Sequence, residues 1–148
     1  MTQAYKYAIL YFLIFSFLLL LSGILLFEHK IGFSVEGVLD YYLGNEDVFT
    51  QQKSSLGILK TILPHLFAFG LFCMVLLHFL VFTKKQKQIQ TKALVYLLFF
   101  SALLEITTPF LIINGYDFFA YIKLISFFVF QALVIYVAWL LFFSITYE

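Results

Sequence analysis

The sequence predicts an all-α integral membrane four-helix bundle, on two observations. Of its 148 residues, 64% are hydrophobic and 11% are charged, whereas soluble domains are about 45–50% apolar and about 25% charged. Four continuous apolar stretches are also long enough to cross a hydrocarbon core of ~30 Å as helices, and they lack the two-residue alternation of membrane β-barrels. These stretches are residues 7–27, 56–82, 93–113 and 119–145.

The first stretch, residues 7–27, is expected to be a permanent membrane anchor. Its apolar part is about twice as long as the ~7–15-residue core of a cleaved signal peptide. The residues that follow, Glu28, His29 and Lys30, do not form a small-residue cleavage site. We therefore expect residues 1–148 to form a single transmembrane domain.

The next segment is predicted to contain a short amphipathic helix over residues 34–43. Apolar residues recur there at helical spacing, Ser34 is placed as an N-cap, and Gly44 is placed as the C-terminal stop. We expect this helix to lie in the membrane interface on the outer side, with its apolar face on lipid or on the mouth of the bundle.

The second stretch, residues 56–82, carries two of the three histidines, His65 in its outer half and His78 near its inner end. Their spacing of 13 residues corresponds to ~19.5 Å of rise and ~140° of rotation on a straight helix. The two rings therefore cannot serve one small metal site. Pro64 lies close enough to the outer end to act as an early-helix residue.

The third and fourth stretches place polar groups where the membrane makes them costly. A charged side chain at the centre of a membrane helix costs about 2.5–3.5 kcal/mol on insertion scales, so such a residue is a functional candidate by default. Counting residues from the outer ends puts Glu105 and His65 at similar depths of ~9–13 Å, so these two side chains could meet. The candidate buried polar residues are Glu105, Gln131, Thr107 and Thr108.

Lysines determine the predicted orientation. The connection over residues 83–92 carries four lysines and no acidic residue, whereas the lysines on the other side are diluted by acidic residues. By the positive-inside rule, both termini face the cytoplasm of a bacterial inner (cytoplasmic) membrane. Lys60 and Lys123 are then expected at the outer mouth of the bundle.

Composition excludes several classes of protein. The chain has a net charge of +1 and no arginine, which excludes a nucleic-acid binder. Its single cysteine excludes a disulfide scaffold. Cys73 and Met74 are adjacent and project ~100° apart on a helix, which does not suit a copper site. The His-Glu-x-x-His motif of zinc proteases is absent.

One interpretation of the histidines is a b-type haem. Such a haem needs imidazoles on facing helices, an aromatic-lined apolar slot and polar groups at its mouth. His65 is the first candidate ligand and His29 or His78 the second, with Glu105 as a nearby proton-linked group. A chain that binds such a haem is expected to act in electron transfer.

Two other interpretations stay open. The chain could be a structural or assembly subunit, in which case we expect other membrane subunits or a second copy as partners besides the lipid bilayer. It could also be a small transporter or channel that uses Glu105 and Gln131 as a polar station within the membrane.

Several segments resemble a group of small, largely uncharacterised bacterial four-helix membrane proteins. The resemblance covers residues 35–126, and Leu63 stands where the group has the first histidine of an H-x-H-L-F pattern. It implies a fold of four membrane helices and an accessory role in respiratory bacteria. The matching residues are Tyr41-Tyr42-Leu43-Gly44-Asn45, His65-Leu66-Phe67-Ala68-Phe69, His78, and Glu105 four residues before Pro109-Phe110.

Overall fold

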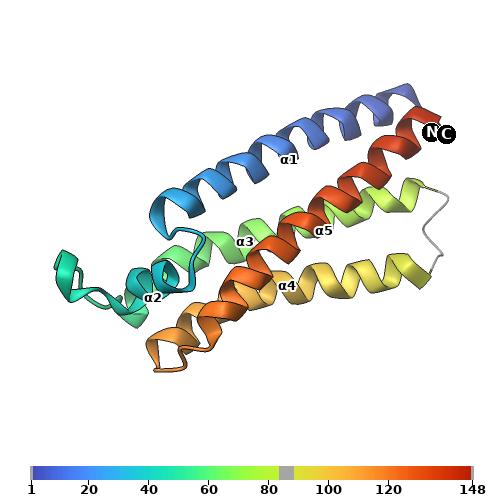
Figure 1. The fold of residues 1–148 in the computed structure, drawn as a ribbon. Coiled ribbons are helices and arrows are strands. Elements are labelled where there is room, and N and C mark those ends of the chain that lie inside the picture. Colours follow the sequence, from blue (N-terminus) through green and yellow to red (C-terminus); the bar gives the residue numbers. More distant parts are fainter. Residues whose placement is uncertain (1, 84–88, 148) are drawn as a thin grey trace.

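The computed structural model describes residues 2–83 and 89–147, and this part of the chain is helical (Figure 1). Four helices are long and apolar enough to cross a membrane, which confirms the predicted all-α architecture with four membrane helices. The long helices are α1 (Gln3–Lys30), α3 (Ser55–Phe79), α4 (Ile89–Ile113) and α5 (Phe119–Tyr147), the short helix is α2 (Val35–Leu43), and single 3-10 turns form η1 (Glu46–Val48) and η2 (Leu80–Phe82).

Helix α5 organises the bundle. Its most extensive contact is with α4, to which a short connection joins it, and α1 packs on α5 while α3 packs on α4. Helices α1 and α3 meet through the ring of Phe12, which lies 5.8 Å from the ring of Phe72 and 5.1 Å from that of Phe79. These contacts close the bundle at the end where both termini lie (Figure 1).

Helix α2 covers the opposite end of the bundle (Figure 1). The Ser34 hydroxyl accepts a hydrogen bond from the Gly37 amide at 3.0 Å, and Gly44 ends the helix with a φ of 84°. Val38 and Tyr42 are buried, and the helix packs against both α4 and α5. The apolar face of α2 therefore packs on the bundle mouth, the second of the two surfaces that its amphipathic pattern allows.

The four long helices differ in how much of their surface the bundle covers. In the most apolar 18 residues of each helix, 39% are buried for α4 and for α5, against 22% for α1 and 11% for α3. The exposed remainder is dominated by large apolar side chains, as lipid-facing helices require. Helix α3 thus offers the largest uncovered face.

Candidate functional site

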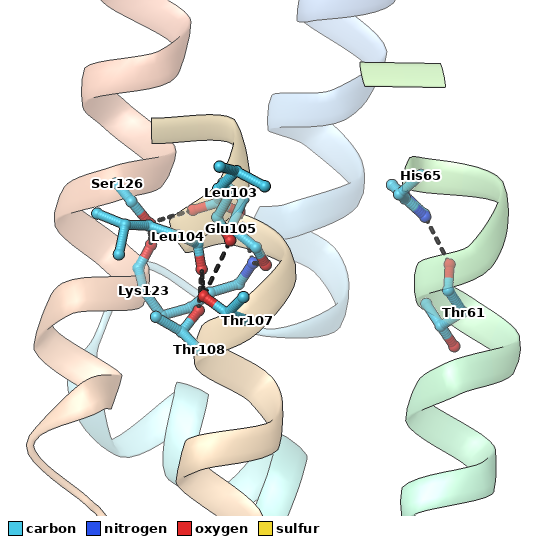
Figure 2. A network of polar contacts seen from close by, with 9 residues as sticks. All are labelled: Thr61, His65, Leu103, Leu104, Glu105, Thr107, Thr108, Lys123 and Ser126. Carbon is cyan, nitrogen blue, oxygen red and sulfur yellow. Dashed lines mark hydrogen bonds and ion pairs between the residues drawn. The ribbon is translucent and has the colours of Figure 1, made fainter. Parts of the chain in front are cut away.

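A buried ion pair joins α4 to α5. Glu105 and Lys123 have side chains that are only 6% and 8% exposed. The Lys123 ammonium donates hydrogen bonds to the Glu105 Oε2 at 2.5 Å and to the Glu105 main-chain carbonyl at 2.9 Å. The Ser126 hydroxyl donates to the other carboxylate oxygen, Oε1, at 2.5 Å (Figure 2). Each oxygen of the carboxylate thus has a donor.

The second bond of Lys123 has a local cause in the sequence of α4. In a regular helix the Glu105 carbonyl would accept a hydrogen bond from the amide of the residue four positions on. That residue is Pro109, which has no N–H to donate. The Lys123 ammonium takes the place of the missing amide. The proline and the acidic residue four positions before it thus form one binding site for a cation.

Tyr42 of α2 is buried where this helix packs against α4 and α5, the two helices that carry the pair. Its side chain is 7% exposed. Burial raises the pKa of the Tyr42 phenol well above its usual range, and the charges of Tyr41 and Glu105 raise it further. Tyr42 belongs to the core cluster that α2 shares with α4 and α5.

The geometry of the pair suits a structural role better than acid–base chemistry. A buried charge that loses its partner is strongly destabilising, whereas a charge that is paired and hydrogen-bonded is tolerated. Here the carboxylate is bonded through both oxygens and the ammonium bonds twice to the same residue. Sliding α4 against α5 by one residue would break several of these bonds at once, so the site fixes the register of the two helices.

The two threonines next to Glu105 have different environments. Thr108 is buried, and its hydroxyl donates to the Leu104 carbonyl at 2.8 Å. Thr107 lies instead on the exposed face of α4, where its hydroxyl donates to the Leu103 carbonyl at 2.9 Å (Figure 2). Adjacent helical residues project ~100° apart, so only one of them faces the bundle interior.

Gln131 is buried between α5 and α1. It is 8% exposed, and its Nε2 atom lies 3.6 Å from the position that a Cβ on Gly23 would occupy. Its Oε1 atom has no hydrogen-bond partner among the residues that the structure describes. The amide is thus an incompletely satisfied polar group within the predicted membrane span.

His65 does not join the Glu105 network, although similar depths suggested that the two could meet. Its side chain is exposed on α3, and its Nδ1 atom lies 2.7 Å from the Thr61 carbonyl (Figure 2). The ring also makes an edge-on contact with Phe69 at 5.8 Å. Glu105 pairs with Lys123 because α4 and α5 are direct neighbours, whereas the His65 ring bonds within its own helix.

All three histidines are exposed. His29 lies at the end of α1 and His78 near the end of α3, and the haem interpretation stays a prediction. In the described ranges, no group of three His, Cys, Asp or Glu side chains could hold a metal ion. His65 has a ring nitrogen bonded to a main-chain carbonyl, a feature of many metal-ligating histidines.

Sequence reasoning missed Lys123 and Ser126 as the partners of Glu105, because Lys123 was placed at the outer mouth. Counted from the α4–α5 connection, Glu105 lies only ~6 Å deeper than Lys123, a distance that a lysine side chain spans. Counting residues could therefore have predicted the pairing. Pro109 also identifies the Glu105 carbonyl as one that lacks its usual amide donor.

Comparison with known proteins gives one match. The profile of a family described as a transmembrane helical domain matches residues 32–148, a range that includes α2 to α5 and therefore the whole ion-pair site. No curated protein and no solved structure matches the chain. Because the match covers most of its length, the chain belongs to this family of transmembrane helical domains.

Proposed function

We propose that the chain is a structural subunit of a membrane complex and binds its neighbour through the exposed face of α3. The observation that carries this proposal is the exposed ring of His65. We define the His65 face as the exposed residues around that ring, which are Lys60, Thr61, Pro64, His65 and Ala68.

The hydrogen bond of His65 fixes the form of its ring. A carbonyl only accepts hydrogen bonds, so Nδ1 carries the proton that bonds the Thr61 carbonyl. In the neutral ring Nε2 is then an acceptor, and it has no hydrogen-bond partner among the described residues. His65 is one and a half turns beyond Lys60, or ~7.5 Å deeper. An unpaired acceptor at such a depth favours a partner that supplies a donor.

A second acceptor lies beside the first. Pro64 removes the amide that would bond the Lys60 carbonyl within the helix. The small side chains of Thr61 and Ala68 on the same face would let another helix approach closely. This combination suits a transmembrane helix that carries hydrogen-bond donors, such as serine, threonine or tryptophan side chains.

The ion pair supports the same proposal from inside the bundle. It fixes α4 against α5, and donors of α5 satisfy both carboxylate oxygens and the main-chain carbonyl of Glu105. Helix α3, by contrast, is the least covered of the long helices. The interior contacts thus hold α4 and α5 rigidly together, and the exposed face of α3 is left to bind another protein.

The test compares His65 with a matched exposed residue. The full-length tagged chain would be purified in mild detergent from its native membranes, and copurifying proteins would be quantified by mass spectrometry. We expect His65→Leu to lower the recovery of one membrane protein, or of a second copy, at least tenfold. Thr107→Val is the control because its hydroxyl is exposed but already bonds within α4. Equal recovery with the His65→Leu variant would contradict the proposal.

Haem binding is a second candidate, favoured by the same ring geometry. With Nδ1 bonded to a main-chain carbonyl, Nε2 is the nitrogen through which His65 would hold a haem iron. The second ligand would come from another chain, and the complex would act in respiratory electron transfer. The test is a reduced-minus-oxidised spectrum of the intact complex, in which His65→Leu should remove the haem bands while the partner is retained. Absence of these bands from the wild-type complex would exclude this candidate.

Transport through Glu105 has less support, because both carboxylate oxygens are bonded to donors of α5.

We also propose that the protein lies in the bacterial inner membrane with both termini in the cytoplasm. The lysine-rich connection over residues 83–92 supports this orientation, as does the location of both termini at one end of the bundle (Figure 1). Terminal reporter fusions that are active only outside the cytoplasm should stay inactive.

A further inference from the structure

A cavity of about 640 Å³ opens at the end of the molecule where α2 lies. It is formed by the last residues of α1, one side of α2 and the segment that leads to α3. The side chains that carry its chemistry are Lys30, Asp40, Tyr41, Asn45 and Lys53.

Lys53 is held in place by two contacts. Its main-chain amide donates to the Tyr42 carbonyl at 3.0 Å, which ties the segment before α3 to the end of α2. Its ammonium lies 4.0 Å from the centre of the Tyr41 ring, a cation–π contact. Lys30, the last residue of α1, supplies the second positive charge of the cavity.

Asp40 adds a negative charge to the same cavity. Its Oδ2 atom accepts a hydrogen bond from the Asn45 side chain at 3.0 Å. Its Oδ1 atom has no partner among the residues that the structure describes, so it is available to a donor. The cavity therefore presents two ammonium groups and one positioned carboxylate.

The position of the cavity points to a membrane ligand. Lys30 ends one membrane helix, and Lys53 lies two residues before the start of another. Both lysines therefore lie where the helices leave the hydrocarbon core, at the level of the lipid headgroups. An occupant at this level that carries a phosphate for the lysines and an ammonium for Asp40 would match the charges of the cavity.

We propose that this cavity binds the headgroup of phosphatidylethanolamine. The phosphodiester lies between Lys30 and Lys53, and the primary ammonium of the ethanolamine donates to Asp40. Phosphatidylcholine has no N–H to donate, and phosphatidylglycerol has no cation, so both bind less well.

The test is native mass spectrometry of the full-length chain in detergent, titrated with each of the three lipids. We expect one phosphatidylethanolamine per chain, bound at least fivefold more tightly than phosphatidylcholine or phosphatidylglycerol. Lys30→Gln and Lys53→Gln should each weaken this binding at least fivefold. Asp40→Asn should remove the preference over phosphatidylcholine. Lys92→Gln is the control, because Lys92 is exposed on α4 but does not line the cavity.

Two results would overturn the proposal. One is equal binding of phosphatidylethanolamine by the wild type and by a folded Lys30→Gln/Lys53→Gln double variant, with folding checked by the helical circular dichroism signal. The other is binding of soluble glycerophosphoethanolamine as tightly as of the lipid, which would assign the cavity to a free phosphoester. Neither result depends on the partner proposed for α3.

Discussion

One ammonium group, that of Lys123, bonds both the side chain and the main chain of Glu105. The main-chain bond exists because Pro109 leaves the Glu105 carbonyl without its usual amide partner. The relationship joins three residues of two helices into a single unit. It has consequences for stability that can be measured.

Removing one member of the ion pair should destabilise the protein strongly. Lys123→Met leaves a buried carboxylate without its counter-charge, a change that costs about 3–5 kcal/mol in the free energy of unfolding. Unfolding by sodium dodecyl sulfate, followed by circular dichroism, measures this loss. The double variant Glu105→Gln/Lys123→Met should recover most of it, because no unpaired charge remains. A double variant as unstable as the single one would contradict the pairing.

Pro109 should be coupled to Lys123. Pro109→Ala supplies an amide for the Glu105 carbonyl, so the main-chain bond of Lys123 becomes dispensable. We therefore expect Lys123→Met to cost about 1 kcal/mol less in the Pro109→Ala background than in the wild type. The same cycle with Pro64→Ala is the control, since Pro64 lies on α3. If Lys123→Met costs the same free energy of unfolding in the wild type, in Pro109→Ala and in Pro64→Ala, then Pro109 plays no part in the Lys123 bond.

Gln131→Leu should stabilise the protein. The Oε1 atom of Gln131 is buried with no hydrogen-bond partner in the described part of the chain, and an unsatisfied buried polar group costs about 1–3 kcal/mol. The same unfolding assay should show a gain of about that size. Thr108→Val should give no such gain, because its hydroxyl already bonds the Leu104 carbonyl. Destabilisation by Gln131→Leu would show that the amide has a partner in the membrane.

Tyr42 should make stability depend on pH in alkaline solution. Burial raises the pKa of its phenol above the unfolded value of about 10. Above about pH 10 the unfolded chain releases this proton while the folded chain keeps it, so the free energy of unfolding falls as the pH rises. Tyr42→Phe lacks this proton, and the lysines titrate in both proteins. The stability advantage of the wild type over Tyr42→Phe should therefore shrink between about pH 9 and about pH 11, and a constant difference would argue against burial of the phenol.

Much of the fold follows from local chemistry in the sequence. Long apolar stretches require helices in a bilayer, and Ser34 and Gly44 mark both ends of α2 through an N-cap bond and a positive φ. Glu105 was identified as a buried charge by depth alone.

The partners and directions of the side chains were harder to predict, because they depend on how helices pack. Lys123 lies near the end of its helix, and only the α4–α5 contact directs its side chain inward to Glu105. Thr107 and Thr108 are chemically equivalent in the sequence, and rotation of α4 exposes one and buries the other. His65 is exposed although it lies three and seven residues from Ile62 and Ile58, which are buried, so its exposure depends on how far α3 is covered and not on its spacing.

The most direct test of the proposed role is photo-cross-linking in intact native membranes. A benzophenone amino acid would replace Ala68 on the His65 face, or Phe15 on the exposed part of α1 as the reference position. We predict a discrete protein adduct at position 68 that disappears when His65→Leu is added, and no such adduct at position 15. Lipid adducts alone at position 68, or a protein adduct that persists without His65, would contradict the proposal.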